Sequence, residues 1–404
     1  MNAVIHPGKL KGTVIAPPSK SMAHRLLICM ALADGCSRIH GIDDSEDILA
    51  TVDCLNALGM KADKQNGVLT VSNGITRDGE EAVLPCRESG STMRFLLPLA
   101  AVFRDRVTVT GSRRLIERGI SAYEDLFQAN GIRVTITENE IRTEGRLNAG
   151  AYILPGNISS QFVSGLLIAL SVCEEESRLS VLPPVESRPY IDMTASVLNQ
   201  YGADIRREDD HTYLIRGGTV FHATESEVEG DWSNASAFYA MNRLGHEITV
   251  TGTNPDSLQG DKNCVPYLEL MSKEGMAIDL SDTPDLGPIL FAAAAAGTGG
   301  KFNGTRRLAL KESNRAQVMI TELAKFGIHG TVDENSVTIF PGTIRKPETL
   351  LDGHGDHRIV MALTALCSLT GGTITGAEAV NKSYPEFFDT MWKLGMRIDF
   401  QEET

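Results

Sequence analysis

The sequence predicts an α/β protein made of six repeats, and two patterns with the same period carry this prediction. In the first pattern, an amphipathic helical segment ends at a glycine and is followed by strand-like residues. Glycine suits the position after a helix because, without a Cβ, it readily takes the left-handed conformation. The six glycines are Gly59, Gly131, Gly202, Gly275, Gly327 and Gly395.

The second pattern is a series of apolar helical segments, each beginning at a residue that suits a helix N-cap. They begin near Ser19, Ser89, Ser159, Asp231, Asp285 and Asp356. Each repeat therefore reads as strand, helix, strand, helix, strand, strand. The glycines of the first pattern are 72, 71, 73, 52 and 68 residues apart, so we expect a shortening between the fourth and fifth repeats.

The repeats also predict where the chain divides into domains. No low-complexity segment or proline-rich linker is visible, so the boundary is expected to lie between repeats. Three repeats on each side of residue 227 is the convenient division, although the repetition by itself does not require groups of three.

The composition is that of an ordinary globular protein, with 404 residues, 42% hydrophobic and 22% charged. Its formal net charge of −14 argues against a nucleic-acid binder, which needs a broad basic face. Small anions remain possible ligands, because a few local arginines and lysines suffice to bind them.

The seven cysteines are scattered and form no CxxC pair, so we expect reduced, mostly buried thiols. No basic segment followed by an apolar stretch opens the chain, and no apolar run is long enough to span a bilayer. These features predict a cytoplasmic protein.

The chemistry is expected at the starts of the helices in the second pattern. Free backbone N–H groups and the positive end of the helix dipole make such positions ready anion sites. Lys20 and Arg25 in the first repeat, and His357 and Arg358 in the sixth, place cations where the dipole disfavours them. An anionic ligand would explain this arrangement. Taken singly, the serines and aspartates are better interpreted as helix caps.

Two further basic clusters fit the same idea. Arg113, Arg114 and Arg118 flank the second helix of the second repeat. Lys311, Glu312 and Arg315 open the second helix of the fifth repeat, where Glu312 and Arg315 are expected to share a helix face. Seen alone, this last cluster is best interpreted as a surface ion pair.

Seven motifs resemble the substrate-binding motifs of the EPSP synthase family, and they occur in the family's order over nearly the whole chain. They are Pro18–Ser21 with Arg25, Gly90–Arg94, Ser159–Gln161, Ser187–Asp192, Lys311–Glu312 with Arg315, Asp356–Arg358, and Lys382–Pro385. The combination is specific, whereas each motif alone is weak.

The resemblance implies a two-domain inside-out barrel with pseudo-symmetry, in which each domain holds three βαβαββ units. The chain would start in one domain, pass through the other and return. Residues 14–227 would form the domain that mainly binds shikimate 3-phosphate. Residues 1–13 with 228–404 would form the domain that mainly binds phosphoenolpyruvate and supplies the acid/base residues.

The resemblance further implies transfer of the enolpyruvyl group of phosphoenolpyruvate to the 5-hydroxyl of shikimate 3-phosphate, in the shikimate pathway of aromatic amino-acid (chorismate) biosynthesis. Addition followed by elimination needs no redox cofactor and no obligatory metal, and no Walker loop or metal-ligand cluster is visible in the sequence. The partners would be the two substrates, with no nucleic acid and no membrane, and the protein would be a monomer.

The roles implied by the resemblance fall on three sets of residues. For shikimate 3-phosphate they are Lys20, Ser21, Arg25, Ser159, Ser160, Gln161, Ser187, Tyr190, Asp285 and Lys311. For phosphoenolpyruvate they are Lys20, Gly90, Arg118, Gln161, Arg315, Arg358 and Lys382. Asp285 and Glu312 would form an acid/base pair, because two carboxylates in a cationic pocket can differ in protonation. Lys20 is an alternative acid, and His357 either donates a proton or orients the site.

Two other functions stay open at this point. The sister enolpyruvyl transferase that acts on UDP-N-acetylglucosamine shares the fold and the chemistry, but it typically has a catalytic cysteine in the second unit, and Gly111–Ala122 contains none. A non-catalytic anion-binding protein of the same fold is the other alternative. The presence of Lys20, Asp285 and Glu312 together argues against it.

Overall fold

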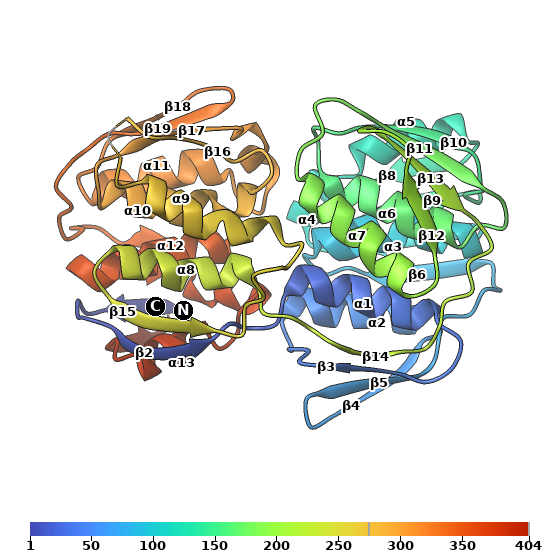
Figure 1. Ribbon diagram of the computed structural model, residues 1–404, viewed down its shortest axis with the longest axis horizontal. Helices are drawn as coiled ribbons and strands as arrows, with labels where there is room; N and C mark the ends of the chain where they lie inside the picture. Colours follow the sequence, from blue (N-terminus) through green and yellow to red (C-terminus); the bar gives the residue numbers. More distant parts are fainter. Residues whose placement is uncertain (274, 403–404) are drawn as a thin grey trace. The chain divides into compact units, whose positions relative to one another are not determined.

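The computed structural model describes residues 1–273 and 275–402, and backbone contacts divide the chain into two compact units. Pro18–Glu229 form what we call the inserted unit, and Met1–Pro17 with Gly230–Thr404 form the terminal unit, which holds both chain ends (Figure 1). The predicted glycine positions agree with the structure, because all six have positive φ, from 69° at Gly275 to 108° at Gly202.

The inserted unit, which the structure describes throughout, contains three sheets and seven helices. The strands are β3 (Ser37–His40), β4 (Lys61–Gln65), β5 (Val68–Asn73), β6 (Glu81–Pro85), β7 (Arg106–Thr110), β8 (Arg133–Ile136), β9 (Glu140–Glu144), β10 (Ala151–Pro155), β11 (Ser177–Leu182), β12 (Asp204–Arg207), β13 (Thr212–Arg216) and β14 (Glu225–Glu227). The helices are α1 (Lys20–Leu32), α2 (Glu46–Ala57), α3 (Gly90–Phe103), α4 (Arg113–Arg118), α5 (Ser121–Ala129), α6 (Ser160–Ser171) and α7 (Arg188–Gln200).

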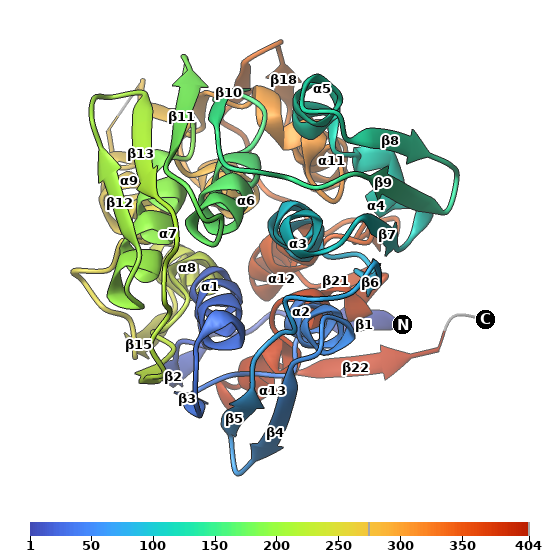
Figure 2. The same cartoon turned by 90° about the vertical axis from the view of Figure 1, so that its right-hand side faces the viewer.

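The three sheets share one topology, which the sheet β6-β7-β9-β8 illustrates. Its first two strands are parallel, and the last two return as an antiparallel hairpin. The sheet β14-β3-β5-β4 matches it only because β14, from the end of the unit, takes the first position beside β3. Helices α1, α3 and α6 are buried over most of their length, and Figure 2 shows them nearly end-on with the strands outside them. This is the inside-out arrangement that the resemblance implied.

The terminal unit repeats the pattern with one sheet cut short. Its strands are β1 (Asn2–Ile5), β2 (Lys11–Ile15), β15 (Glu247–Thr251), β16 (Ala277–Asp279), β17 (Gly300–Asn303), β18 (Gly330–Val332), β19 (Ser336–Ile339), β20 (Leu351–Asp352), β21 (Gly372–Thr375) and β22 (Ile398–Gln401). Its helices are α8 (Trp232–Arg243), α9 (Cys264–Leu270), α10 (Gly287–Ala295), α11 (Arg315–Lys325), α12 (His357–Thr370) and α13 (Phe387–Lys393), with 3-10 turns η1 (Gly260–Asn263), η2 (Pro284–Leu286), η3 (Arg306–Leu310) and η4 (Ala377–Lys382).

The predicted shortening falls in the fourth repeat. Its sheet consists of β15 and β2 alone, whereas the sheets β16-β17-β19-β18 and β20-β21-β1-β22 have four strands each. After α9 the chain passes directly to β16, the first strand of the next repeat, so the returning hairpin is missing. The absent hairpin accounts for the short spacing between Gly275 and Gly327.

The unit boundaries differ slightly from the predicted residues 13/14 and 227/228. Strand β2 continues to Ile15, which pairs with Thr251 of β15, so the chain leaves the terminal unit only after Pro17. Strand β14 pairs with β3, and the N–H of Val228 still donates to the carbonyl of His40, so the return comes after Glu229. Which substrate each domain binds stays a prediction.

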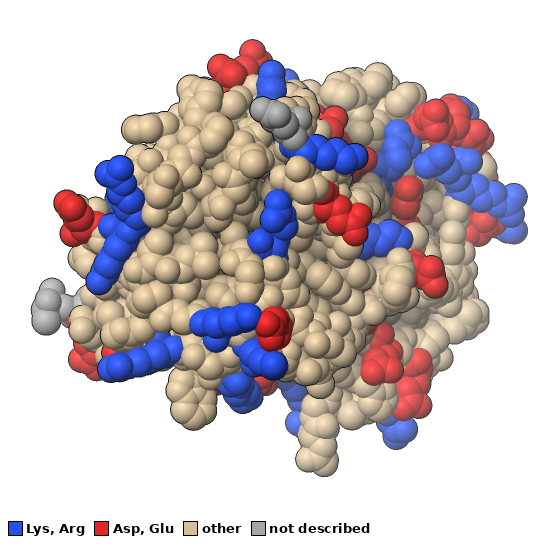
Figure 3. All heavy atoms as spheres, turned by 60° about the vertical axis from the view of Figure 1, so that its left-hand side comes forward, with Lys and Arg blue, Asp and Glu red and all other residues tan. Residues whose placement is uncertain are grey.

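The face of the molecule shown in Figure 3 carries charges of both signs. Among the described residues on the face shown in Figure 3, Lys and Arg are interspersed with Asp and Glu, and uncharged residues separate them. The seven cysteines are free thiols, and all except Cys36 are buried.

Candidate functional site

The helix starts of the inserted unit are capped as predicted, and the caps fix the positions of the residues that follow. The Oγ atoms of Ser19, Ser89 and Ser159 accept bonds from backbone N–H groups two or three residues on, at 3.3–3.4 Å. Lys20, Gly90 and Ser160 consequently begin their helices. In the terminal unit, Asp231 and Asp356 cap α8 and α12 in the same way.

Asp285 does not follow this pattern, and the prediction that it caps a helix is wrong. Asp285 lies in η2, and the following helix α10 has no side-chain cap. The carboxylate of Asp285 binds cations instead.

Arg113, Arg114 and Arg118 flank α5 as expected, and they lie in the separate helix α4. One further expectation is corrected. Glu312 precedes α11, because the side chain of Asn314 caps that helix at the N–H of Gln317.

Lys20, the cation at the start of α1, is paired with a carboxylate that the sequence did not indicate. Its Nζ lies 2.7 Å from Oδ2 of Asp47 on α2, and both side chains are largely buried. Asp47 stands 27 residues away, and no sequence motif connects the two. The pairing fixes the ammonium group at the helix start.

Arg25 ties α1 to α7 by bonds to neutral oxygens. Its Nε donates to Oγ1 of Thr194 at 2.7 Å, and its Nη atoms donate to the carbonyls of Ser21 at 2.6 Å and Tyr190 at 2.9 Å. The guanidinium also lies over the ring of Phe95, 5.1 Å from its centroid. Burial lowers the pKa of Arg25 to about 10, so the side chain stays charged at neutral pH.

Ser187, Tyr190 and Gln161 occupy neighbouring helix starts. Ser187 is buried, takes a left-handed φ of 54° and precedes α7, whose first turn contains the half-buried Tyr190. Gln161 lies in the first turn of α6 and links it to α3. Its Oε1 accepts from Arg94 Nη1 at 2.7 Å, and its Nε2 donates to Oγ of Ser91 at 2.8 Å.

Gly90 is confined by two arginines. A Cβ built on it would lie 3.0 Å from Nη2 of Arg118 and 3.1 Å from Nη1 of Arg94, so a side chain there would displace the guanidinium groups. Arg94 is buried against the ring of Phe162. The sequence motif contained Arg94, but no role was predicted for it.

A buried hydrogen-bond chain holds the start of α3 in place. Oγ1 of Thr51 lies 2.7 Å from both Nδ1 of His24 and Oγ1 of Thr92, and Thr92 donates to Oγ of Ser89 at 2.7 Å. Burial lowers the pKa of His24 to about 3, so its imidazole is neutral. The chain joins α1, α2 and α3 without introducing charge.

Arg315 is the centre of the charged cluster in the terminal unit, and the interpretation of a surface ion pair is wrong because the side chain is only 1% exposed. Its Nε donates to Oδ2 of Asp356 at 2.8 Å and its Nη1 to Oδ1 of Asp285 at 2.6 Å. Its Nη2 donates to Oε2 of Glu312 at 2.8 Å and to Oδ1 of Asp356 at 3.1 Å. Three carboxylates thus surround one guanidinium.

The cluster sets the protonation of Asp285 and Lys311. Desolvation alone would raise the pKa of Asp285, but Lys311, Arg315 and Arg358 outweigh it and hold this pKa well below its ordinary value. Lys311 Nζ lies 2.9 Å from Oδ1 of Asp285, and desolvation lowers the pKa of its ammonium group. Asp285 is therefore an ionised carboxylate at neutral pH.

The remaining cations lie around the start of α12. Arg358 is 7% exposed, and its Nη1 donates to Oδ1 of Asn234 at 2.9 Å. Lys382 Nζ donates to the carbonyl of Gly355 at 2.8 Å. His357 is buried, with Nδ1 3.9 Å from Oδ1 of Asp356. The sequence-based residue sets did not include Asn234 or Asp356.

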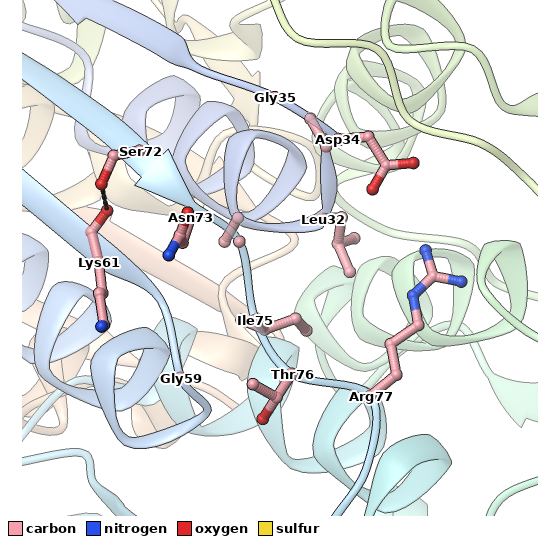
Figure 4. Close-up of a pocket in the computed structure, with 13 residues that line it drawn as sticks. Leu32, Asp34, Gly35, Gly59, Lys61, Ser72, Asn73, Ile75, Thr76 and Arg77 are labelled. Carbon is pink, nitrogen blue, oxygen red and sulfur yellow. Dashed lines mark hydrogen bonds between the residues drawn. The ribbon is translucent and has the colours of Figure 1, made fainter.

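Two cavities of the inserted unit have different relations to these residues. The cavity in Figure 4, of about 560 Å³, has Asp34, Lys61 and Arg77 on its walls and none of the predicted substrate residues. A second cavity, of about 450 Å³, is lined by α4, α5 and the β8–β9 turn and includes Arg118. Arg118 therefore lines this second cavity.

A family model described as EPSP synthase (3-phosphoshikimate 1-carboxyvinyltransferase) matches residues 4–391. The chain is 36% identical to the 3-phosphoshikimate 1-carboxyvinyltransferase of Clostridium kluyveri, covering 98% of this chain and 97% of that one. It is 33% identical to the protein of the same name from Clostridioides difficile, covering 98% of each.

Solved structures share the fold at lower identity. EPSP synthase from Acinetobacter baumannii superposes with a TM-score of 0.80 at 23% identity, covering 99% of this chain and 100% of that one. The enolpyruvyl transferase NikO from Streptomyces tendae superposes with a TM-score of 0.75 at 16% identity, covering 98% of each chain. In the part of the chain that is described, no helix is long and apolar enough to cross a membrane.

Proposed function

Because this chain belongs to the EPSP synthase family, we propose that it transfers the enolpyruvyl group of phosphoenolpyruvate to the 5-hydroxyl of shikimate 3-phosphate. The products are 5-enolpyruvylshikimate 3-phosphate and phosphate, in the shikimate pathway. The observation that carries the proposal is the cluster around Arg315, in which Asp285 and Glu312 lie beside several cations. Anionic substrates and proton transfers both need such a combination.

Residues of the inserted unit would bind shikimate 3-phosphate. Ser159, Ser160 and Gln161 offer hydroxyl, amide and backbone N–H donors at the start of α6, which suits its phosphate. Lys20 and Ser21 begin α1 in the same way, Ser187 directly precedes α7, and Tyr190 lies in its first turn. Arg25 keeps its charge near them, although several of its donors are used within the unit.

The cations that the resemblance assigns to phosphoenolpyruvate are found in each unit. Arg118 lies beside Gly90 in the inserted unit, and Arg358 and Lys382 lie around the start of α12 in the terminal unit. The sequence also assigned Arg315 to this substrate. The carboxylates around Arg315 favour a second task, which is to hold Asp285 and Glu312 in place.

The proton transfers would fall to the terminal cluster. As the 5-hydroxyl oxygen attacks C2 of phosphoenolpyruvate, the ionised Asp285 takes its proton, and C3 gains a proton to give the tetrahedral intermediate. Loss of a proton from C3 and of phosphate from C2 completes the transfer. Glu312 and Lys20 are the two candidate proton donors to C3, and His357 orients the site. A comparison of the solvent isotope effects on the rates of E312Q and K20M would show which of the two is the donor.

Phosphate release tests the function directly. We expect release from phosphoenolpyruvate only when shikimate 3-phosphate is present, and at the same rate with a chelator, since the chemistry requires no metal or cofactor. Release that depends instead on UDP-N-acetylglucosamine would overturn the assignment. We also propose that the protein is a cytoplasmic monomer. Light scattering during size-exclusion chromatography measures its oligomeric state.

A further inference from the structure

The amide side chain of Asn234 joins two segments that carry predicted phosphoenolpyruvate ligands. It is fully buried in the first turn of α8. Its Oδ1 accepts from Nη1 of Arg358 at 2.9 Å, and its Nδ2 donates to the carbonyl of Ser383 at 3.3 Å and lies 3.2 Å from Ser383 Oγ. Ser383 directly follows Lys382.

The orientation of this amide is fixed by its partners. A guanidinium group can only donate, so the oxygen of Asn234 must face Arg358. The backbone carbonyl of Ser383 can only accept, so the NH₂ group must face that side. The backbone N–H of Asn234 is held in turn by Oδ1 of Asp231 at 2.7 Å, which anchors the residue to the cap of α8.

The bond from Asn234 leaves another donor of Arg358 available. Nε of Arg358 is buried and has no hydrogen-bond partner among the described residues. A buried guanidinium donor without a partner is unfavourable unless an acceptor arrives. The partner of Nη1 is a neutral amide, so this bond does not neutralise the charge of Arg358.

We propose that Asn234 is a positioning residue that turns Arg358 toward phosphoenolpyruvate and fixes the Lys382–Ser383 segment beside it. A neutral amide does this without neutralising the arginine, which a carboxylate at the same place would do. This inference rests on the proposed function, because it takes Arg358 as a ligand of phosphoenolpyruvate.

Two substitutions test the inference through steady-state kinetics with each substrate varied. N234A removes the acceptor, and we expect the KM for phosphoenolpyruvate to rise about tenfold, as for loss of one bond to a charged group. N234D keeps the side-chain volume but places a negative charge against Arg358, so we expect a larger rise. The KM for shikimate 3-phosphate should change less than twofold in both variants.

Asn242 provides the matched control. It lies on the same helix, but its amide bonds only the backbone of Ile248, with Nδ2 to the carbonyl at 2.6 Å and the N–H to Oδ1 at 2.7 Å. N242A therefore also loses side-chain hydrogen bonds, without reaching Arg358, and we expect both KM values to stay at the wild-type level. If N234A does not fold, N234S replaces it.

The double variant N234A/R358A separates failure of this inference from failure of the proposed function. If Asn234 acts through Arg358, N234A adds a smaller rise in an R358A background than in the wild type, and the rise that remains reflects the Lys382–Ser383 segment. An R358A variant with an unchanged KM for phosphoenolpyruvate would refute the proposed ligand itself. If R358A raises that KM while N234A and N234D do not, or if they raise the two KM values equally, the role of Asn234 alone is refuted.

Discussion

Arg25 and Arg94 of the inserted unit are held differently from Arg315 of the terminal unit. In the inserted unit, Arg25 donates to hydroxyl and carbonyl oxygens, and Arg94 donates to the amide oxygen of Gln161. In the terminal unit, Arg315 is surrounded by three carboxylates. Neutral acceptors orient an arginine without neutralising it, so that its charge can attract a ligand, whereas carboxylates neutralise that charge within the protein. The inserted unit is therefore suited to binding anions, and the Arg315 cluster to ordering carboxylates for proton transfer.

The largest effect should come from removing Arg315. R315A leaves Asp285, Glu312 and the buried Asp356 without their common counter-charge, so we expect a loss of about 3–5 kcal/mol in the free energy of unfolding. Both tryptophans, Trp232 and Trp392, lie in the terminal unit, so fluorescence during urea unfolding reports on that unit.

R25A is the counterpart in the inserted unit. Its lost partners are neutral, and unsatisfied neutral acceptors cost about 1–3 kcal/mol. Circular dichroism follows the unfolding of this variant. A loss in R25A as large as that in R315A would show that the contrast between the two kinds of partner has no energetic meaning.

Kinetics should separate ligands from organisers. R358A is expected to raise the KM for phosphoenolpyruvate about 10- to 100-fold, because it removes a charge-assisted bond to that anion. R315K should mainly lower kcat, since it disturbs the two carboxylates rather than the substrate contact. Steady-state rates with both substrates varied measure this. If R315K and R358A raise the KM for phosphoenolpyruvate equally, the assignment of Arg315 to that substrate is supported instead.

The stability of the terminal unit should depend on the protonation of Asp285. Its pKa is depressed in the folded state, so its stabilising contribution is fully present above its ordinary value of 3.8 and is lost as the pH falls through the depressed value. We expect D285N to unfold more easily than the wild type at pH 7, by at most about 1 kcal/mol because the side chain is 32% exposed. The difference should persist down to pH 3.8 in urea titrations followed by fluorescence. A difference that vanishes already near pH 6 would contradict an ionised, low-pKa carboxylate.

The smallest effect is expected at Gly90. In G90A the new methyl group meets the ends of two flexible arginine side chains, so Arg118 and Arg94 shift by tenths of an ångström while the helix stays intact. We expect a rise of about twofold to fivefold in the KM for phosphoenolpyruvate, since less than one charged hydrogen bond is lost. The melting temperature should change by less than about 2 °C. Equal rises for both substrates would mean that this helix start serves more than one ligand.

Much of the fold could be predicted from the sequence because the signals are local. The glycines after the helices, the serines and aspartates before them and the 52-residue spacing each depend on a few neighbouring residues or on simple counting. They predicted the repeats, most of the caps and the shortened repeat. The resemblance added the inside-out arrangement, which places α1, α3 and α6 inside the sheets.

The sequence by itself also determined which residue types stand at the helix starts, whereas only the tertiary structure decided how they are partnered. Lys20 meets Asp47 across 27 residues, Arg315 meets Asp356 across 41, and Arg358 meets Asn234 across 124. A cap or a turn is selected by the conformation of adjacent residues. A side-chain pair between helices depends on packing that brings distant segments within about 3 Å. Whether a buried arginine keeps its charge for a ligand or shares it with carboxylates is fixed by that packing.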